Sequence, residues 1–176
     1  MNETISILKL ASKFLNPKDV RSFMNYVQVL KDDELDTIKF MASNGHIAIK
    51  VTRKGTAFSD HLALPNQVSN ESILKAAKVN EFSLLNEGEP GVRFPDYDKC
   101  FNRTDKYNLE RVGFDTRYLA LIFTALEQFR KEMKLALTVI AIDALSISSA
   151  NLMSLIIDPD SPNEIKIDIA IMPCKL

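Results

Sequence analysis

The chain has 176 residues, of which 46% are hydrophobic and 26% charged, and its formal net charge is −1. This length and composition suit one ordinary globular domain. The net charge excludes a strongly basic protein, but the chain can still carry a local basic face. No apolar run reaches membrane-spanning length, and the polar start at Asn2, Glu3 and Thr4 is unlike a signal peptide. Two cysteines without motif spacing, Cys100 and Cys174, fit a reducing compartment. We therefore expect a cytoplasmic protein without a membrane partner.

The first 54 residues predict a helix followed by three strands. Asn2 or Thr4 can cap a helix whose apolar face ends at Leu15, and Asn16-Pro17 then ends the helix. Strand-like runs follow at 22–30, 36–42 and 46–53. The last two runs are joined by Asn44-Gly45, which predicts a tight turn because both residues tolerate positive φ.

The rest of the chain predicts an irregular insert and then a similar unit. Residues 55–106 carry few signals beyond a short helix at 73–79 and a brief strand at 81–85. From residue 107 onward the pattern predicts a strand at 109–114 and a helix from Asp115 or Thr116 to about Lys131. Strands are then expected at 135–142, at 145–148 or 152–157, and at 164–172.

These elements favour one α+β domain over residues 1–176. We expect two helices packed on one side of an antiparallel sheet, with a helix-plus-strand-meander unit repeated twice, once in 1–54 and once in 107–176.

Five short stretches occur in an order known from one protein family. They are 18–25 (KDVRSFMN), 42–46 (ASNGH), 93–97 (RFPDY), 112–119 (VGFDTRYL) and 172–176 (MPCKL). This series resembles the middle and last domains of bacterial sliding clamps, the β subunit of DNA polymerase III. The chain departs from the family in carrying length for one domain where a clamp chain carries three. Asn44 also stands where the family has Asp, and Lys175 where it has Arg.

The resemblance implies a hydrophobic pocket that receives short linear peptides from polymerases and other DNA-handling proteins. In the family, this pocket lies between the Gly-His turn, the Pro-Asp-Tyr linker and the C-terminal tail. Carried over to this sequence, it involves Arg21, Met24, Gly45, His46, Pro95, Lys99, Cys100, Leu152, Ser154, Ala170, Met172, Pro173, Cys174, Lys175 and Leu176. Because the turn and the tail belong to adjacent domains in the family, we expect single-domain copies to form the pocket between subunits. For His46 the alternative is a turn residue with one satisfied ring nitrogen.

The resemblance also implies a ring around double-stranded DNA, whose inner helices meet phosphates without reading sequence. The candidate DNA-binding residues are Lys9, Lys13, Lys18, Arg21, Arg117, Arg130, Lys131 and Lys134. The alternative for these residues is an ordinary solvated helix face, because Glu127 and Glu132 dilute the basic charge of the second helix. Self-association into a head-to-tail ring would take about six copies in this family's geometry.

Nothing in the sequence points to catalysis, and no cofactor is expected. The chain contains no Gly-rich phosphate loop, no His-Glu-x-x-His and no nucleophile elbow, and its histidines and cysteines lack metal-ligand spacing.

We therefore expect a non-catalytic, sliding-clamp-like processivity factor for DNA replication. The alternative is an adaptor or decoy that does not encircle DNA and binds clamp-binding peptides or a host clamp. A plain α+β domain of unrelated function is the third reading. A shortened clamp is compatible with a phage or mobile element as its source.

Overall fold

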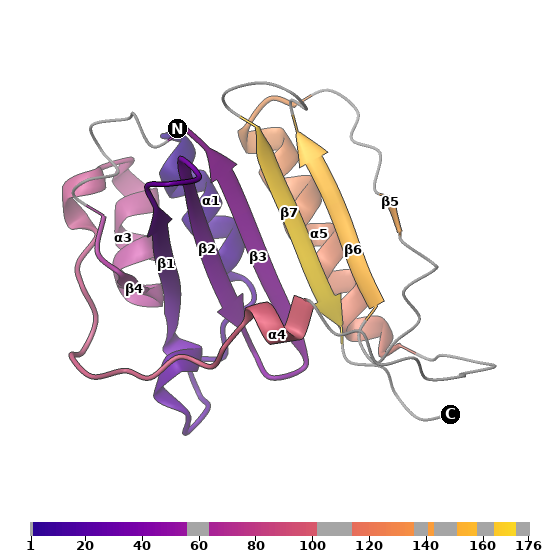
Figure 1. Cartoon of the computed structure of the whole chain (residues 1–176), viewed down its shortest axis with the longest axis horizontal. Helices are drawn as coiled ribbons and strands as arrows, with labels where there is room; N and C mark the ends of the chain where they lie inside the picture. The colour runs from indigo at the N-terminus through magenta and orange to yellow at the C-terminus, as the bar shows by residue number, and fades with distance from the viewer. Residues whose placement is uncertain are drawn as a thin grey trace.

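The computed structural model describes residues 2–55, 64–101, 114–135, 141–142, 151–157 and 164–171. These residues form one antiparallel sheet with helices against one face (Figure 1). The strand order is β4-β1-β2-β3-β7-β6-β5. Two of the seven strands are short edge strands, β4 (Gln67–Ser69) and β5 (Ala141–Ile142). The body of the sheet is formed by β1 (Tyr26–Asp32), β2 (Thr37–Ser43), β3 (Ile47–Lys54), β7 (Ile165–Ile171) and β6 (Asn151–Ile157).

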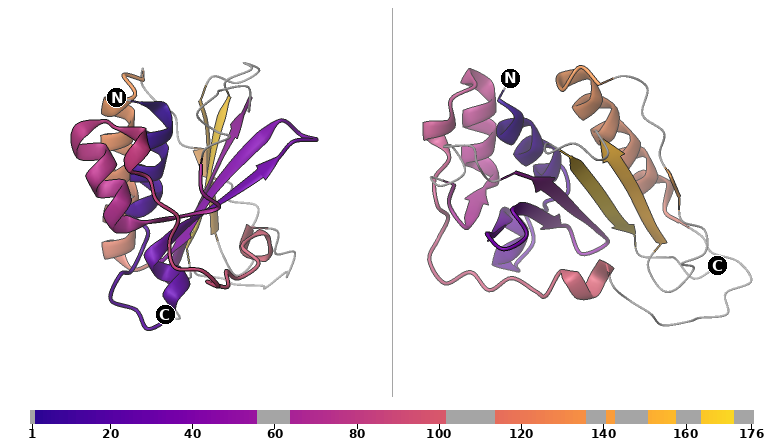
Figure 2. Two further views of the ribbon diagram at one scale, coloured as in Figure 1. Left: turned by 90° about the vertical axis from the view of Figure 1, so that its left-hand side faces the viewer. Right: turned by 45° about the horizontal axis from the view of Figure 1, so that its top comes forward.

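Three helices lie on one face of the sheet, where the sequence predicted two. They are α1 (Glu3–Ser12), α3 (Asn70–Val79) and α5 (Thr116–Glu132), and Figure 2 shows all three on the same side. The short helix α4 (Asp98–Phe101) lies on the opposite side of the sheet. Helix α1 contacts both α3 and α5, and eight of its ten residues are buried. The helix that was expected to present a polar face is therefore the centre of the helical layer.

The starts of α1 and α5 follow the capping signals, whereas α1 ends at Ser12, before the predicted end at Asn16-Pro17. The Asn2 side chain accepts hydrogen bonds from the backbone N–H groups of Thr4 and Ile5, as predicted, and the Asp115 side chain caps α5 in the same way. Helix α3 is longer than predicted, because the Ser69 side chain accepts from the backbone N–H of Ser72 and starts the helix earlier. Residues 67–79 are thus more regular than their sequence pattern indicated.

Other predicted boundaries were wrong or lie outside the described residues. The first four residues of the expected strand at 22–30 form a 3-10 turn, Ser22–Asn25, and the expected strand at 81–85 contains a 3-10 turn, Phe82–Leu84. Two alternative strands were predicted after α5, and the one at 152–157 is confirmed as β6. The alternative at 145–148 lies outside the described residues. Residues 109–113 of the expected strand before α5 also lie outside them. The described residues do not show the predicted repeat, because the strand expected at 135–142 is described as a strand only at Ala141–Ile142, β5.

The two halves of the chain meet along β3 and β7, which pair in an antiparallel ladder from Ile47↔Ile171 to Arg53↔Ile165. Alternate residues of this ladder, including Ile49 and Ile169, belong to the hydrophobic core beneath the helices. The core is therefore shared by both halves. No helix in the described part of the chain is long and apolar enough to cross a membrane.

Shortening one side chain at this junction tests whether the halves form one cooperative unit. Ile169 is 1% exposed, so we expect Ile169→Ala to lower the free energy of unfolding by about 2–5 kcal/mol, through lost burial and the cavity left behind. Urea denaturation measures this change. Leu35→Ala is the control, because Leu35 is 66% exposed and its truncation should change stability by less than about 0.5 kcal/mol. An equally small effect of Ile169→Ala would contradict a shared core.

Candidate functional site

The turn between β2 and β3 is fixed by its own side chains. Gly45 has φ +87°, a conformation that glycine adopts without steric cost. The Asn44 Oδ1 atom accepts hydrogen bonds from the backbone N–H groups of His46 and Ile47, each at 3.0 Å. The Ser43 hydroxyl donates to the Ile47 carbonyl at 2.9 Å and accepts from the Gly45 N–H at 3.0 Å. The predicted tight turn is confirmed, and it holds His46 at a defined place.

Arg21 and Met24 pack directly against this turn. A Cβ atom built on Gly45 would lie 2.9 Å from Arg21 Nη2 and 3.0 Å from Met24 Cε. Met24 is buried, whereas the Arg21 side chain is about half exposed and is held by Asp19. Arg21 Nε and Nη2 donate to the two carboxylate oxygens of Asp19 at 2.8 and 2.9 Å. These bonds lower the pKa of Asp19 to about 2. The structure thus brings together Arg21, Met24, Gly45 and His46, which the sequence placed in one pocket.

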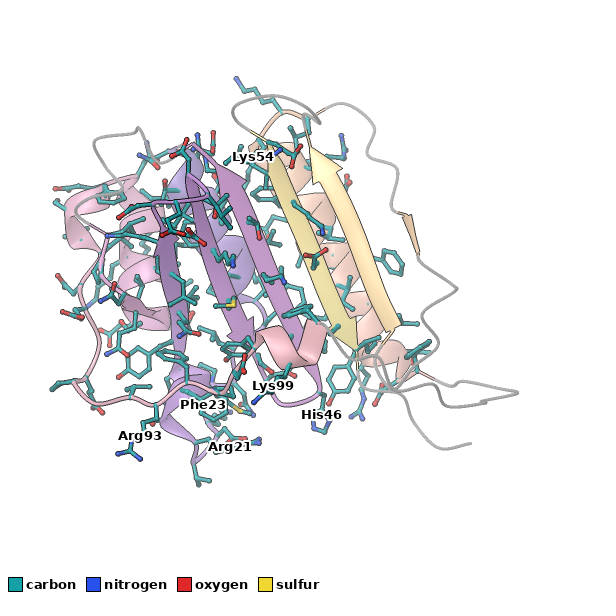
Figure 3. All side chains as sticks on the ribbon, in the orientation of Figure 1. Arg21, Phe23, His46, Lys54, Arg93 and Lys99 are labelled. Atoms are coloured by element: carbon teal, nitrogen blue, oxygen red, sulfur yellow. The ribbon has the colours of Figure 1, made fainter. Side chains whose placement is uncertain are left out.

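His46 stacks on Tyr118, a residue that the sequence analysis did not assign to the site. Their ring centroids are 5.2 Å apart and the ring planes are 20° from parallel. Tyr118 lies in the first turn of α5, just after Asp115, whose pKa is lowered to about 2 mainly by the hydrogen bond from the Arg117 side chain. Figure 3 shows His46 at the same end of the sheet as Arg21 and Phe23. An aromatic pair therefore connects the turn of the first half to a helix of the second half.

The last strand brings the C-terminal residues towards the same turn. Ile171 pairs with Ile47, the residue after His46, and Ala170 pairs with Ala48. Residues 172–176, which carry five of the predicted pocket positions, follow Ile171 directly and lie outside the described residues. This register belongs to one chain. The pocket between subunits stays a prediction, because its tail wall falls on residues outside the described part of the chain.

The linker side of the predicted pocket is only partly described. Pro95 and Lys99 are exposed, and Lys99 pairs with Asp96 at 3.3 Å. Helix α4 contacts β7, and the ammonium of Lys50 lies 4.7 Å from the ring centroid of Phe101 at the end of α4. Of the remaining predicted positions, Cys100 lies in α4, and Leu152 and Ser154 lie in β6.

Most of the predicted DNA-binding residues are engaged in ion pairs. Lys9 was expected on a polar helix face, but its ammonium pairs with Glu132 of α5 and its side chain is only 22% exposed, because neighbouring helices enclose α1. Others pair with a nearby carboxylate: Arg21 with Asp19, Arg117 with Asp115, and Arg130 and Lys131 with Glu127. Lys13, Lys18 and Lys134 are exposed, and within the described residues no ion pair is found for them. No group of three or more potential metal ligands occurs in this part of the chain either.

Comparing two glycine variants separates the effect of close packing at the turn from the effect of its left-handed backbone. We expect Gly45→Ala and Gly91→Ala to cost about 1–2 kcal/mol each from the left-handed backbone, since Gly91 also has a positive φ, of +84°. Only at Gly45 would the new methyl group also displace Arg21 and Met24, because nothing lies within 4 Å of a Cβ atom on Gly91. Urea denaturation and the NMR signals of the Met24 methyl group measure the two effects. Unmoved Met24 signals in Gly45→Ala would contradict the close packing of the turn.

Comparison with known proteins relates this arrangement to one kind of fold. No protein-family model matches the sequence, and no curated protein matches it. A β sliding clamp of Caulobacter crescentus, solved with polyethylene glycol bound, aligns with 100% of this chain at 14% identity and a TM-score of 0.58. The DNA polymerase sliding clamp of Pseudomonas aeruginosa aligns with 98% of the chain at 15% identity and a TM-score of 0.55. Each alignment extends over 64% of the clamp chain. By its fold, this chain is a clamp-like protein that matches part of a bacterial β sliding clamp.

Proposed function

We propose that this protein is a non-catalytic, clamp-like accessory of DNA replication that binds short peptides of its partners beside the Gly45-His46 turn. The observation that carries the proposal is the junction of β3 with β7 in a clamp-like fold. It joins the turn to the start of the C-terminal segment within one chain. The end of β7, from which the C-terminal segment continues in the sequence, therefore lies beside the turn.

The surroundings of the turn suit an extended, partly apolar peptide. Met24 offers an adaptable thioether side chain, and the His46–Tyr118 stack offers aromatic surface. Arg21, already oriented by Asp19, adds hydrogen-bond donors at the rim. A few oriented polar groups around an apolar floor are typical of peptide-binding sites. In this proposal residues 172–176 supply the opposite wall.

Contact with DNA is the second part of the proposal. It would use the exposed side of the helical layer. Two of the predicted DNA-binding residues, Lys13 and Lys134, lie there without an ion pair among the described residues. Such contacts reach phosphates only, so they would bind double-stranded DNA without reading its sequence. Head-to-tail self-association into a ring would gather these weak contacts around one duplex.

One observation favours an adaptor that does not encircle DNA. Arg117, Arg130 and Lys131 all pair with carboxylates on α5 or at its cap, which reduces the positive potential of that helix. An adaptor or decoy would retain the peptide site and dispense with the ring. The mass of the particle in solution, with and without duplex DNA, separates the two: a ring-sized oligomer supports the clamp, and a monomer or dimer supports the adaptor.

Removing the end of the chain tests the peptide site. We expect deletion of Lys175 and Leu176 to leave the urea midpoint unchanged and to weaken binding of a fluorescein-labelled clamp-binding peptide by about tenfold, which corresponds to about 1.4 kcal/mol. His46→Ala should weaken binding in the same assay, because it removes one half of the aromatic stack. Leu74→Ala is the control, since Leu74 is an exposed residue of α3. Unchanged affinity in both site variants would refute the peptide site, and unfolding of the truncated chain would make residues 175–176 structural.

Charge reversal on the helices tests DNA contact. Lys13→Glu combined with Lys134→Glu should lower the affinity for duplex DNA and reduce the slope of log affinity against log salt by about 2, one for each lost phosphate contact. Lys9 is left intact, because a carboxylate there would face Glu132 and destabilise the helix pair. Lys39→Glu reverses one charge in β2, away from the helices, and should have little effect when it is compared with Lys13→Glu alone. An equal loss in the control would indicate that only net charge matters.

A further inference from the structure

A groove at the β4 edge of the sheet belongs to neither the peptide site nor the DNA face. It has a volume of about 490 Å³, and its walls come from β1, from the approach to β4, and from residues 87–94. This volume lies within the range of ligand-binding sites. We propose that the groove binds a short extended peptide segment in which a basic side chain is adjacent to an apolar one. The inference does not rest on the function proposed above.

One wall of the groove is fixed before any ligand arrives. Glu87 forms a β-bridge with Val68 of β4, and the Gln67 side-chain amide donates to the Glu89 carbonyl at 2.6 Å. Gly88 lies flat against the Tyr26 ring, since a Cβ atom at this position would be 2.1 Å from Tyr26 Cε1. Only glycine permits such an approach of the backbone to the ring. The wall is therefore rigid, and a ligand would not have to order it.

The polar groups of the groove select a cation. Glu87 is the only ionisable residue among those that line it, and no lysine or arginine does so. The carboxamides of Gln28, Asn66 and Gln67 also line the groove and add further acceptors for N–H donors. An arginine or lysine side chain can pair with the carboxylate and donate its remaining hydrogens to the amide oxygens.

The apolar residues of the groove indicate that the second side chain of the ligand is apolar. Leu30 is 40% exposed although it lies in a strand, and Phe94 lines the same groove. A bound leucine-sized side chain would cover this surface, and the Phe94 ring can also accept a cation on its face. Glu87 already occupies the outer edge of β4 at Val68, so the peptide would be held in the groove by its side chains and not by strand pairing.

A nucleic acid fits these walls less well than a peptide. Phosphodiester groups are bound by lysine, arginine or helix N-termini, and the lining contains no basic side chain. Arg93, which lies between the lining residues Val92 and Phe94 in the sequence, does not line the groove, and Figure 3 shows its side chain pointing away from the sheet. The carboxylate of Glu87 would repel a phosphate.

The test uses the full-length protein labelled with ¹⁵N and a capped tetrapeptide, acetyl-Ala-Arg-Leu-Ala-amide. Saturable shifts are expected in the side-chain NH₂ signals of Gln28, Asn66 and Gln67 and in the backbone signals of Gly88, with a dissociation constant below about 1 mM. Glu87→Gln should weaken this binding about fivefold or more, because it removes the charge and retains the backbone bridge. A peptide with glutamine in place of arginine should bind the unaltered protein more weakly by a similar factor.

Glu34→Gln provides the matched control, since Glu34 is an exposed carboxylate of the β1–β2 hairpin and does not line the groove. Its affinity for the tetrapeptide should equal that of the unaltered protein. The proposal is overturned if the glutamine peptide binds equally well, if Glu87→Gln has no effect, or if the shifts fall at the Gly45 turn instead. It is also overturned if a single-stranded oligothymidine moves the groove signals and the tetrapeptide does not.

Discussion

The pairing of β3 with β7 is the constraint on which the rest of the structure depends. Its two strands come from opposite ends of the sequence, and seven residue pairs join them between Ile47↔Ile171 and Arg53↔Ile165. Every second residue faces the helices, so one ladder supplies isoleucines from both halves to a single core. A slip of one residue would turn these isoleucines to the other face. The core therefore fixes the register, and the register fixes which segments meet at each end of the ladder.

The two ends of this ladder differ in chemistry. At one end, Arg53 is 2% exposed and pairs with Glu3 of α1, while it also donates to the carbonyls of Lys54 and Gly55. Lys54 pairs there with Glu164 at 3.1 Å, so charges of α1, β3 and the start of β7 neutralise one another. At the other end, the Gly45 turn carries an exposed histidine on an aromatic partner. The first end holds the helix to the sheet, and the second is the end with groups available to a ligand.

Local signals in the sequence predicted where helices and turns begin. They did not predict which distant segments these elements contact. The caps at Asn2 and Asp115 and the Asn44-Gly45 turn were identified because each depends on residues close together in the chain. The 3-10 turn at Ser22–Asn25 was missed because its residues also fit a strand pattern, and because its role is to place Met24 against the distant Gly45. The contact of His46 with Tyr118 spans the two halves. Tyr118 belonged to the 112–119 stretch of the resemblance but was not assigned to the pocket, because no local pattern predicts a stack across that distance.

The burial of α1 changes the electrostatic argument for a clamp. With α3 on one side and α5 on the other, α1 exposes few side chains, and its Lys9 neutralises Glu132 instead of facing solvent. Within the described residues, the predicted DNA-binding cations without an ion pair are thus Lys13, Lys18 and Lys134. Affinity from so few phosphate contacts is low, and its dependence on salt is shallow, because the slope scales with the number of contacts. Retention on DNA would then have to come from closure of several copies around the duplex, because linking weak sites multiplies their effect without any new contact. If the protein acts on DNA, assembly and not the charge of one chain is the property that makes it do so.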